Sequence, residues 1–96
     1  MRQIGRDVVQ ALKERRSFRK GNTEVARADI YTDVYLFGNR IARYFDTGDF
    51  EINLQTLREW PTPTTASRLN DILRGLQRND YVSVRRGGPF INNIRI

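Results

Sequence analysis

Apolar residues near the N-terminus recur at the spacing of one face of an α-helix. These residues are Ile4, Val8, Val9 and Leu12. Their spacing predicts an amphipathic helix over residues 3–16, although Gly5 weakens its first turn. Basic side chains continue along the chain through residues 15–20, and Gly21-Asn22 is expected to stop the helix.

The hydrophobic period changes from 3.6 to 2 between residues 23 and 54, which is typical of β-strands. Ile30, Thr32, Val34 and Leu36 alternate with Tyr31, Asp33, Tyr35 and Phe37. Gly38-Asn39 then predicts a two-residue hairpin turn. After a second turn at residues 46–49, a third strand alternates Phe50, Ile52 and Leu54. The pattern therefore predicts a three-stranded antiparallel meander.

The predicted hairpin register divides the side chains of the meander between two faces. It sets Phe37 opposite Arg40, and Asp33 opposite Tyr44. The core-like face contains Val34, Leu36, Ile41, Arg43 and Phe45. The other face gathers Tyr31, Tyr35, Phe37, Arg40 and Tyr44. Two interpretations of this second face stay open: bases stack on its rings while arginine meets phosphate, or the N-terminal helix or a second subunit covers it.

The C-terminal half is predicted to contain a second helix and a β-hairpin. Residues 55–64 are expected to be extended, because a residue that precedes proline is disfavoured in the helical region. A helix then begins at Thr64, with Thr64 or Thr65 as its N-cap, and ends near Asn79. Its apolar stripe consists of Leu69, Ile72, Leu73 and Leu76. Residues 81–85 and 90–96 form the hairpin around Gly87-Gly88, which completes a single α+β domain over residues 1–96.

The composition of the chain favours binding over catalysis. Its 17 basic residues comprise 15 arginines and two lysines, and it contains neither histidine nor cysteine. Arginine does not exchange protons near neutral pH, but its planar guanidinium group binds phosphate and carboxylate bidentately. The net charge of +6 is unevenly distributed, because residues 21–60 are acidic while both flanking segments are basic. Such a field attracts nucleic acid or an acidic protein surface.

Three groups of residues are candidates for contact with a partner. The first group is Arg15, Arg16 and Arg19 at the end of the first helix, where cations also complement the helix dipole. The second is the aromatic face of the meander, represented by Tyr35, Arg40 and Tyr44. The third is a helix followed by a basic hairpin tip, and it comprises Arg68, Arg74, Arg78, Arg85 and Arg86. For each group, a solvated charged or structural surface is the alternative interpretation.

No catalytic, cofactor or metal site is expected from the sequence. Asp46-Thr47-Gly48 matches the tripeptide that carries the catalytic aspartate of aspartic proteases, but it is also an ordinary hairpin loop. The glycines fit no phosphate-binding loop, and the carboxylates lack the spacing of metal ligands. The chain has no apolar run that would span a membrane. We therefore expect a non-enzymatic protein that binds DNA or RNA with little sequence specificity, or alternatively an acidic protein surface, and that could gain buried area as a homodimer.

Two segments in the middle of the chain carry a distinctive pattern: a Tyr-Leu-x-Gly-Asn hairpin at Tyr35–Asn39, and a Trp-x-Thr-x-Thr-Thr-x-x-Arg-Leu-Asn segment at Trp60–Asn70. Through these segments, residues 35–70 resemble a family of small uncharacterised tailed-phage proteins. The resemblance implies a phage-encoded protein that is made in an infected bacterium, and the cytoplasm of that host is the location we expect. In the alternative interpretation, the protein inhibits or redirects an acidic host protein during infection. A structural or self-assembling phage component is a third hypothesis. In the second segment Arg68 and Asn70 are expected to point away from Leu69 and to contact another molecule, while Trp60 covers the end of the core.

Overall fold

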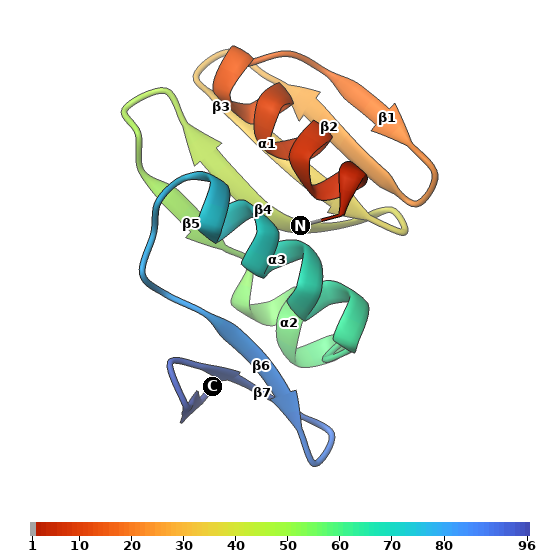
Figure 1. The fold of residues 1–96 in the computed structure, drawn as a ribbon, viewed down its shortest axis with the longest axis vertical. Helices are drawn as coiled ribbons and strands as arrows, with labels where there is room; N and C mark the ends of the chain where they lie inside the picture. The colour runs from red at the N-terminus through yellow and green to blue at the C-terminus, as the bar shows by residue number, and fades with distance from the viewer. Residues whose placement is uncertain (1) are drawn as a thin grey trace.

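The computed structural model describes residues 2–96, which form three helices and two antiparallel sheets (Figure 1). The helices are α1 (Gln3–Glu14), α2 (Leu54–Glu59) and α3 (Pro63–Gly75). The first sheet has the order β1 (Phe18–Lys20), β2 (Thr23–Arg27), β3 (Tyr31–Leu36), β4 (Asn39–Phe45) and β5 (Phe50–Ile52). The second contains β6 (Val82–Arg85), β7 (Gly88–Ile91) and β8 (Ile94–Arg95). The α+β class predicted from the sequence is confirmed.

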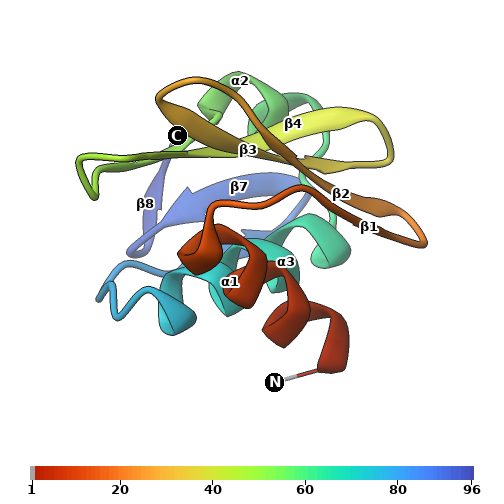
Figure 2. The same cartoon turned by 90° about the horizontal axis from the view of Figure 1, so that it is seen from above.

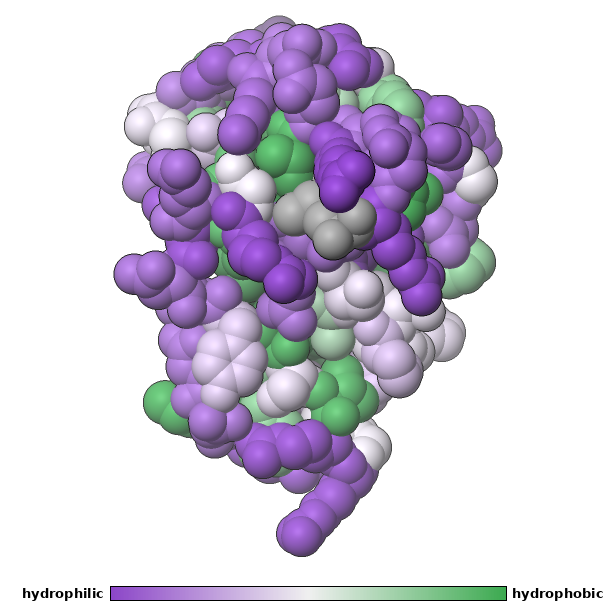
Figure 3. All heavy atoms as spheres, in the orientation of Figure 1, coloured by the Kyte–Doolittle hydropathy of each residue, from purple (hydrophilic) through white to green (hydrophobic). Residues whose placement is uncertain are grey.

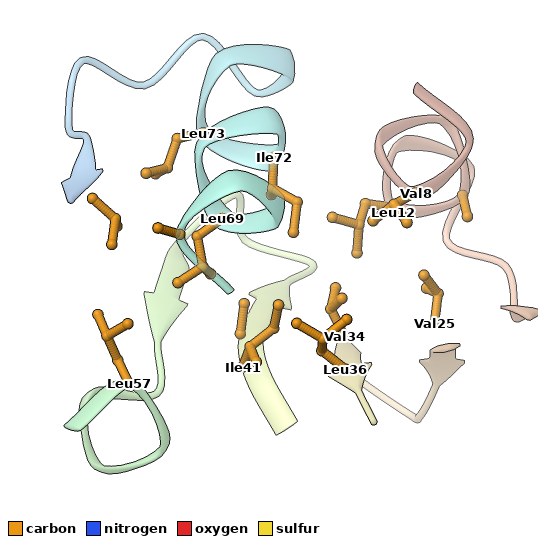
Figure 4. Packing of buried hydrophobic residues seen from close by; sticks show 14 residues of the cluster. Val8, Leu12, Val25, Val34, Leu36, Ile41, Leu57, Leu69, Ile72 and Leu73 are labelled. Atoms are coloured by element: carbon orange, nitrogen blue, oxygen red, sulfur yellow. The ribbon is translucent and has the colours of Figure 1, made fainter. Parts of the chain in front are cut away.

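Helices α1 and α3 lie side by side on one face of the five-stranded sheet (Figures 1 and 2). Between the helices and the sheet lies one core, to which each layer contributes apolar side chains (Figure 4). The core includes Val8 and Leu12 from α1, Leu69, Ile72 and Leu73 from α3, Val25, Val34, Leu36 and Ile41 from the sheet, and Leu57 from α2. The predicted stripes of both long helices therefore face the sheet.

Two glycines allow α1 and α3 to approach closely. A Cβ atom on Gly5 would lie 2.3 Å from a carboxylate oxygen of Asp71, and one on Gly75 would lie 2.4 Å from Val9. Helix α1 begins at Gln3, before Gly5, and the close approach to α3 explains why glycine lies at this position.

The sheet contains two strands more than the predicted meander. Helix α1 ends at Glu14, and its C-cap Arg15 takes a left-handed backbone conformation with φ of 53°. The charged segment that follows forms edge strand β1, which pairs with β2. Gly21-Asn22 does not stop the helix, because it is the two-residue turn between Lys20 and Thr23, which pair with each other.

The register predicted for the β3–β4 hairpin is wrong. The turn is Phe37-Gly38, with φ of 50° and 80°, so Leu36 pairs with Asn39. An irregularity at Ile41 then shifts the register again, so that Asp33 pairs with Arg43 rather than with Tyr44. In the observed register Tyr44 is paired with Thr32 and packs against the core, on the face opposite Tyr35.

The connection to α3 is also more ordered than predicted. Residues 54–59 form α2, where an extended segment was expected, and the side chain of Asn53 caps this helix. Helix α3 begins at Pro63 rather than at Thr64, because Thr62 is the N-cap and accepts a hydrogen bond from the Thr65 amide. The predicted C-terminal hairpin is present, and β8 extends it to three strands.

Candidate nucleic-acid interface

The basic residues that follow α1 are largely held in ion pairs. We call residues 15–27 the N-terminal basic region. Arg15 and Arg27 share the carboxylate of Asp46, at 3.2 and 2.6 Å. Arg16 pairs with Glu14, and Lys20 lies 3.5 Å from a carboxylate oxygen of Asp7. Arg19 lies on β1 across from Glu24 of β2.

Two of the acids in these pairs, Asp46 and Glu14, have pKa values below their ordinary values. Hydrogen bonds from the Arg27 guanidinium hold the pKa of Asp46 below its usual range, and Arg15 acts in the same direction. The Arg16 guanidinium lowers the pKa of Glu14, and Gln10 adds to this effect. The positive charge of the region is therefore partly neutralised within the protein.

The Asp46-Thr47-Gly48 segment is the turn between β4 and β5, and Gly48 supplies the positive φ of 97° that the turn requires. The Asp46 carboxylate binds Arg15 and Arg27, and the carbonyl oxygen of Gly48 accepts a hydrogen bond from Arg78. Arginines from two distant parts of the chain thus hold this turn in place.

The sheet face opposite α1 and α3 carries a further ion pair. Arg43 binds Asp33 bidentately, at 2.8 and 3.1 Å, and this pairing raises the pKa of Arg43. The guanidinium group also lies 3.8 Å from the ring centroid of Tyr31. Arg40, a candidate contact residue, pairs with Tyr35 on the same face, and its Nη1 atom is buried without a hydrogen-bond partner in residues 2–96. The prediction that Arg43 faces the core is therefore wrong: its guanidinium group lies on this surface and covers the ring of Tyr31.

The candidate arginines of α3 have different environments. Arg68 is only 5% exposed and lies 3.8 Å from Asp71, so the prediction that it projects from the surface is wrong. Arg74 is exposed and reaches the same carboxylate at 3.5 Å. Burial lowers the pKa of Arg68, and Asp71 opposes this effect.

Asn70 was also expected to contact another molecule, but it connects α3 to the second sheet. Its amide nitrogen donates to the carbonyl oxygen of Val82 at 2.7 Å, and its side-chain oxygen accepts from the Val82 amide at the same distance. Both backbone groups of a buried strand residue are thereby satisfied. Val84 and Ile91 complete the attachment by packing against the core.

The outer face of the second sheet carries arginines around one aromatic ring. The guanidinium carbon of Arg85 lies 4.2 Å from the centroid of Phe90, and that of Arg95 lies 5.7 Å from it. Arg86 occupies the exposed turn between β6 and β7, with φ of 53°. We call Arg85, Arg86, Phe90 and Arg95 the C-terminal basic face. Arg85 and Arg86 were predicted as contact residues, whereas Phe90 and Arg95 were not.

The C-terminal basic face differs from the other candidate sites in its charge. Residues 81–96 contain no aspartate or glutamate. None of the three arginines forms an ion pair within residues 2–96, although Arg85 makes a long hydrogen bond of 3.4 Å to Asn93. Figure 3 shows that the side of the molecule seen in Figure 1 is mostly hydrophilic. Unneutralised guanidinium groups beside an aromatic ring are suited to phosphate and base contacts.

The described residues contain neither a candidate metal cluster nor a membrane-spanning helix. Residues 2–96 contain no group of three potential acidic metal ligands. No helix in the same residues is long and apolar enough to cross a membrane.

Comparison with known proteins identifies one family. Neither the curated proteins nor the solved structures contain a match to the chain. The family model described as Kyanoviridae Gp96 protein matches residues 1–95, which extends the resemblance of residues 35–70 to nearly the whole sequence. This match confirms the expected origin in a tailed phage. The chain belongs to the Kyanoviridae Gp96 family of phage proteins.

Proposed function

We propose that this phage protein is a non-catalytic accessory protein that binds nucleic acid through the C-terminal basic face, with little sequence specificity, in the cytoplasm of the infected bacterium. The observation that carries the proposal is the cluster of three exposed arginines around Phe90 without an acidic partner among the described residues. A guanidinium group that is not neutralised inside the protein is available to a phosphate.

The geometry of this face supports contact with the backbone more than sequence readout. The arginines lie on a short sheet and its turn, and no long helix projects from the face to enter a major groove. The Arg85 guanidinium group lies 4.2 Å from the centroid of Phe90 and offers its own planar face, on which a base can stack whatever the sequence. The absence of histidine and cysteine from the sequence supports the non-catalytic part of the proposal.

A salt titration of binding to single- and double-stranded DNA tests this function. The Arg85→Ala, Arg86→Ala double variant is expected to lose about tenfold or more in affinity at low salt, and its plot of log K against log salt flattens by roughly 1.5 units. The matched control is Arg15→Ala, Arg16→Ala, which removes the same charge from residues that are already ion-paired. Circular dichroism checks that both variants fold.

The results distinguish the C-terminal basic face from a general charge effect. Equal losses in the two double variants would show that net charge, rather than this face, determines binding. No binding by the wild-type protein at low salt would overturn the nucleic-acid function.

An acidic host protein is the second candidate partner, because a free guanidinium group binds carboxylate as well as phosphate. A pull-down from nuclease-treated host lysate, with wild-type protein and the Arg85→Ala, Arg86→Ala variant, tests this alternative. A single acidic protein that only the wild type retains would favour the alternative, provided that DNA binding is absent.

A further inference from the structure

Two hollows of different chemistry meet at the start of α3. The larger, of about 380 Å³, lies between the β3–β4 turn and the α2–α3 connection. Leu36 and Ile41 contribute its apolar lining, and the side chains of Phe37 and Trp60 line it although they are 70% and 52% exposed. Exposed aromatic rings that line an apolar hollow suit a flat apolar group, which would cover them from water.

The smaller hollow, of about 200 Å³, is positively charged. Arg2 and Arg68 line it together with the hydroxyl residues Thr64 and Ser67, in the first turns of α3. The dipole of α3 also favours an anion at its N-terminus, although the Thr65 amide is already bonded to the Thr62 side chain. Arg2 is close enough to contribute to the lowered pKa of Arg68, so two cations face the same small space.

A second observation also indicates that an anion belongs in the smaller hollow. Arg68 is nine-tenths buried, and its Nε atom has no hydrogen-bond partner in the structure described. Asp71 forms an ion pair with Arg68 at 3.8 Å, which is longer than a hydrogen bond, and its carboxylate oxygen Oδ2 is likewise buried without a hydrogen-bond partner in the described residues. A buried guanidinium group with an unused donor is costly unless a ligand satisfies it.

Thr64 lines both hollows, so they adjoin. We propose that together they form a nucleotide-binding site, in which the base lies between Phe37 and Trp60 and the phosphate binds Arg2 and Arg68 at the start of α3. The ligand is either a free nucleotide or one nucleotide of a single strand, since both present a flat base joined to a phosphate. This site uses none of the residues of the C-terminal basic face, and it goes beyond the function proposed for that face.

The only tryptophan of the chain is a direct probe of this site. Titration of the full-length protein with AMP is expected to quench the fluorescence of Trp60, because the base stacks on the indole ring. Adenosine tests the phosphate contact without altering the protein, and it is expected to bind about tenfold more weakly than AMP. Ribose 5-phosphate, which lacks a base, is expected to cause no quenching.

Variants on the two sides of the site provide independent controls. Phe37→Asn keeps a residue that tolerates the left-handed turn, and it is expected to weaken AMP and adenosine alike. Arg2→Ala changes an exposed residue, and it is expected to weaken AMP by about fivefold while adenosine is unaffected. Arg85→Ala, Arg86→Ala is expected to leave AMP quenching unchanged, which separates this site from the function proposed above.

A short single-stranded oligonucleotide identifies the source of the nucleotide. If it quenches Trp60 at lower concentration than AMP does, the site takes one nucleotide of a strand, and weaker binding of the oligonucleotide indicates a free nucleotide. Absence of quenching by both AMP and the oligonucleotide would overturn the proposal. Quenching that Phe37→Asn and Arg2→Ala leave unchanged would overturn it as well.

Discussion

The N-terminal basic region and the C-terminal basic face are both rich in arginine, but they use it differently. In the N-terminal basic region, Arg15 and Arg27 bind Asp46, and Arg16 binds Glu14. These ion pairs help to hold the end of α1 and the β4–β5 turn in place. In the second, Arg85 and Arg95 lie against Phe90 and have no acid in their own segment of sequence. The number of basic residues therefore overestimates how much positive charge the N-terminal basic region offers to an anion.

The two surfaces also differ in how they are attached to the rest of the protein. The strands of the N-terminal basic region belong to the five-stranded sheet, whose core residues Val25 and Val34 pack under α1. The C-terminal sheet is joined to the body by its inner apolar face and by the two hydrogen bonds of Asn70. A change at this attachment should affect only one of the two surfaces.

The largest expected effect comes from Asn70→Ala. The substitution leaves the buried amide and carbonyl of Val82 without partners, which should lower the free energy of unfolding by about 1–3 kcal/mol. Hydrogen exchange should accelerate in residues 81–96 more than in the five-stranded sheet. Gln10→Ala is the control, because it removes an exposed side-chain amide and should change stability by less than about 0.5 kcal/mol. Unchanged protection of residues 81–96 would show that apolar packing alone holds the C-terminal sheet.

A smaller effect, on affinity for DNA, is expected when the arginines of the N-terminal basic region are freed from their ion pairs and so become more like those of the C-terminal basic face. Asp46→Asn releases Arg15 and Arg27, so the N-terminal basic region should gain about two- to fivefold in affinity for DNA at low salt. Asp29→Asn adds the same net charge, but its carboxylate takes part in no ion pair within residues 2–96. Fluorescence anisotropy with a labelled oligonucleotide measures both variants. An equal gain in the two would mean that net charge matters and that release of the arginines does not.

The helices and the order of the main elements could be predicted from the sequence because their signals are local. The spacing of Val8 and Leu12, and that of Leu69 and Ile72, places each pair on one face of a helix, and this spacing does not depend on the tertiary structure. The register of the β3–β4 hairpin could not be predicted from the sequence. Phe37 takes a left-handed backbone conformation in the turn, and such positions are usually occupied by glycine or asparagine. Helix α2 is only six residues long and lies between a strand and two prolines, so it lacked a periodic signal.

Only part of the candidate site could be predicted for a related reason. The positions of Arg85 and Arg86 follow from the short turn between two apolar strands, which is local. Arg95 reaches Phe90 only because a second turn, Asn92-Asn93, adds β8 to the hairpin. The pairing of Arg15 with Asp46 joins residues 31 positions apart, and Asp71, the partner of the buried Arg68, lies against Gly5 of α1. Such contacts depend on tertiary structure.

The smallest expected effect is a difference in how the two surfaces respond to acid. Because the pKa of folded Asp46 lies below its ordinary value of 3.8, its ion pairs stabilise the fold above that pH, and this contribution is lost as the pH falls through the folded pKa. The difference in Tm between wild type and Asp46→Asn should therefore shrink in acid. For Arg85→Ala, Arg86→Ala the difference should stay constant across the same range, because no carboxylate pairs with either arginine in residues 2–96. If both differences shrink together, the acid response reflects total charge, and the two surfaces differ less in their electrostatics than their ion pairs indicate.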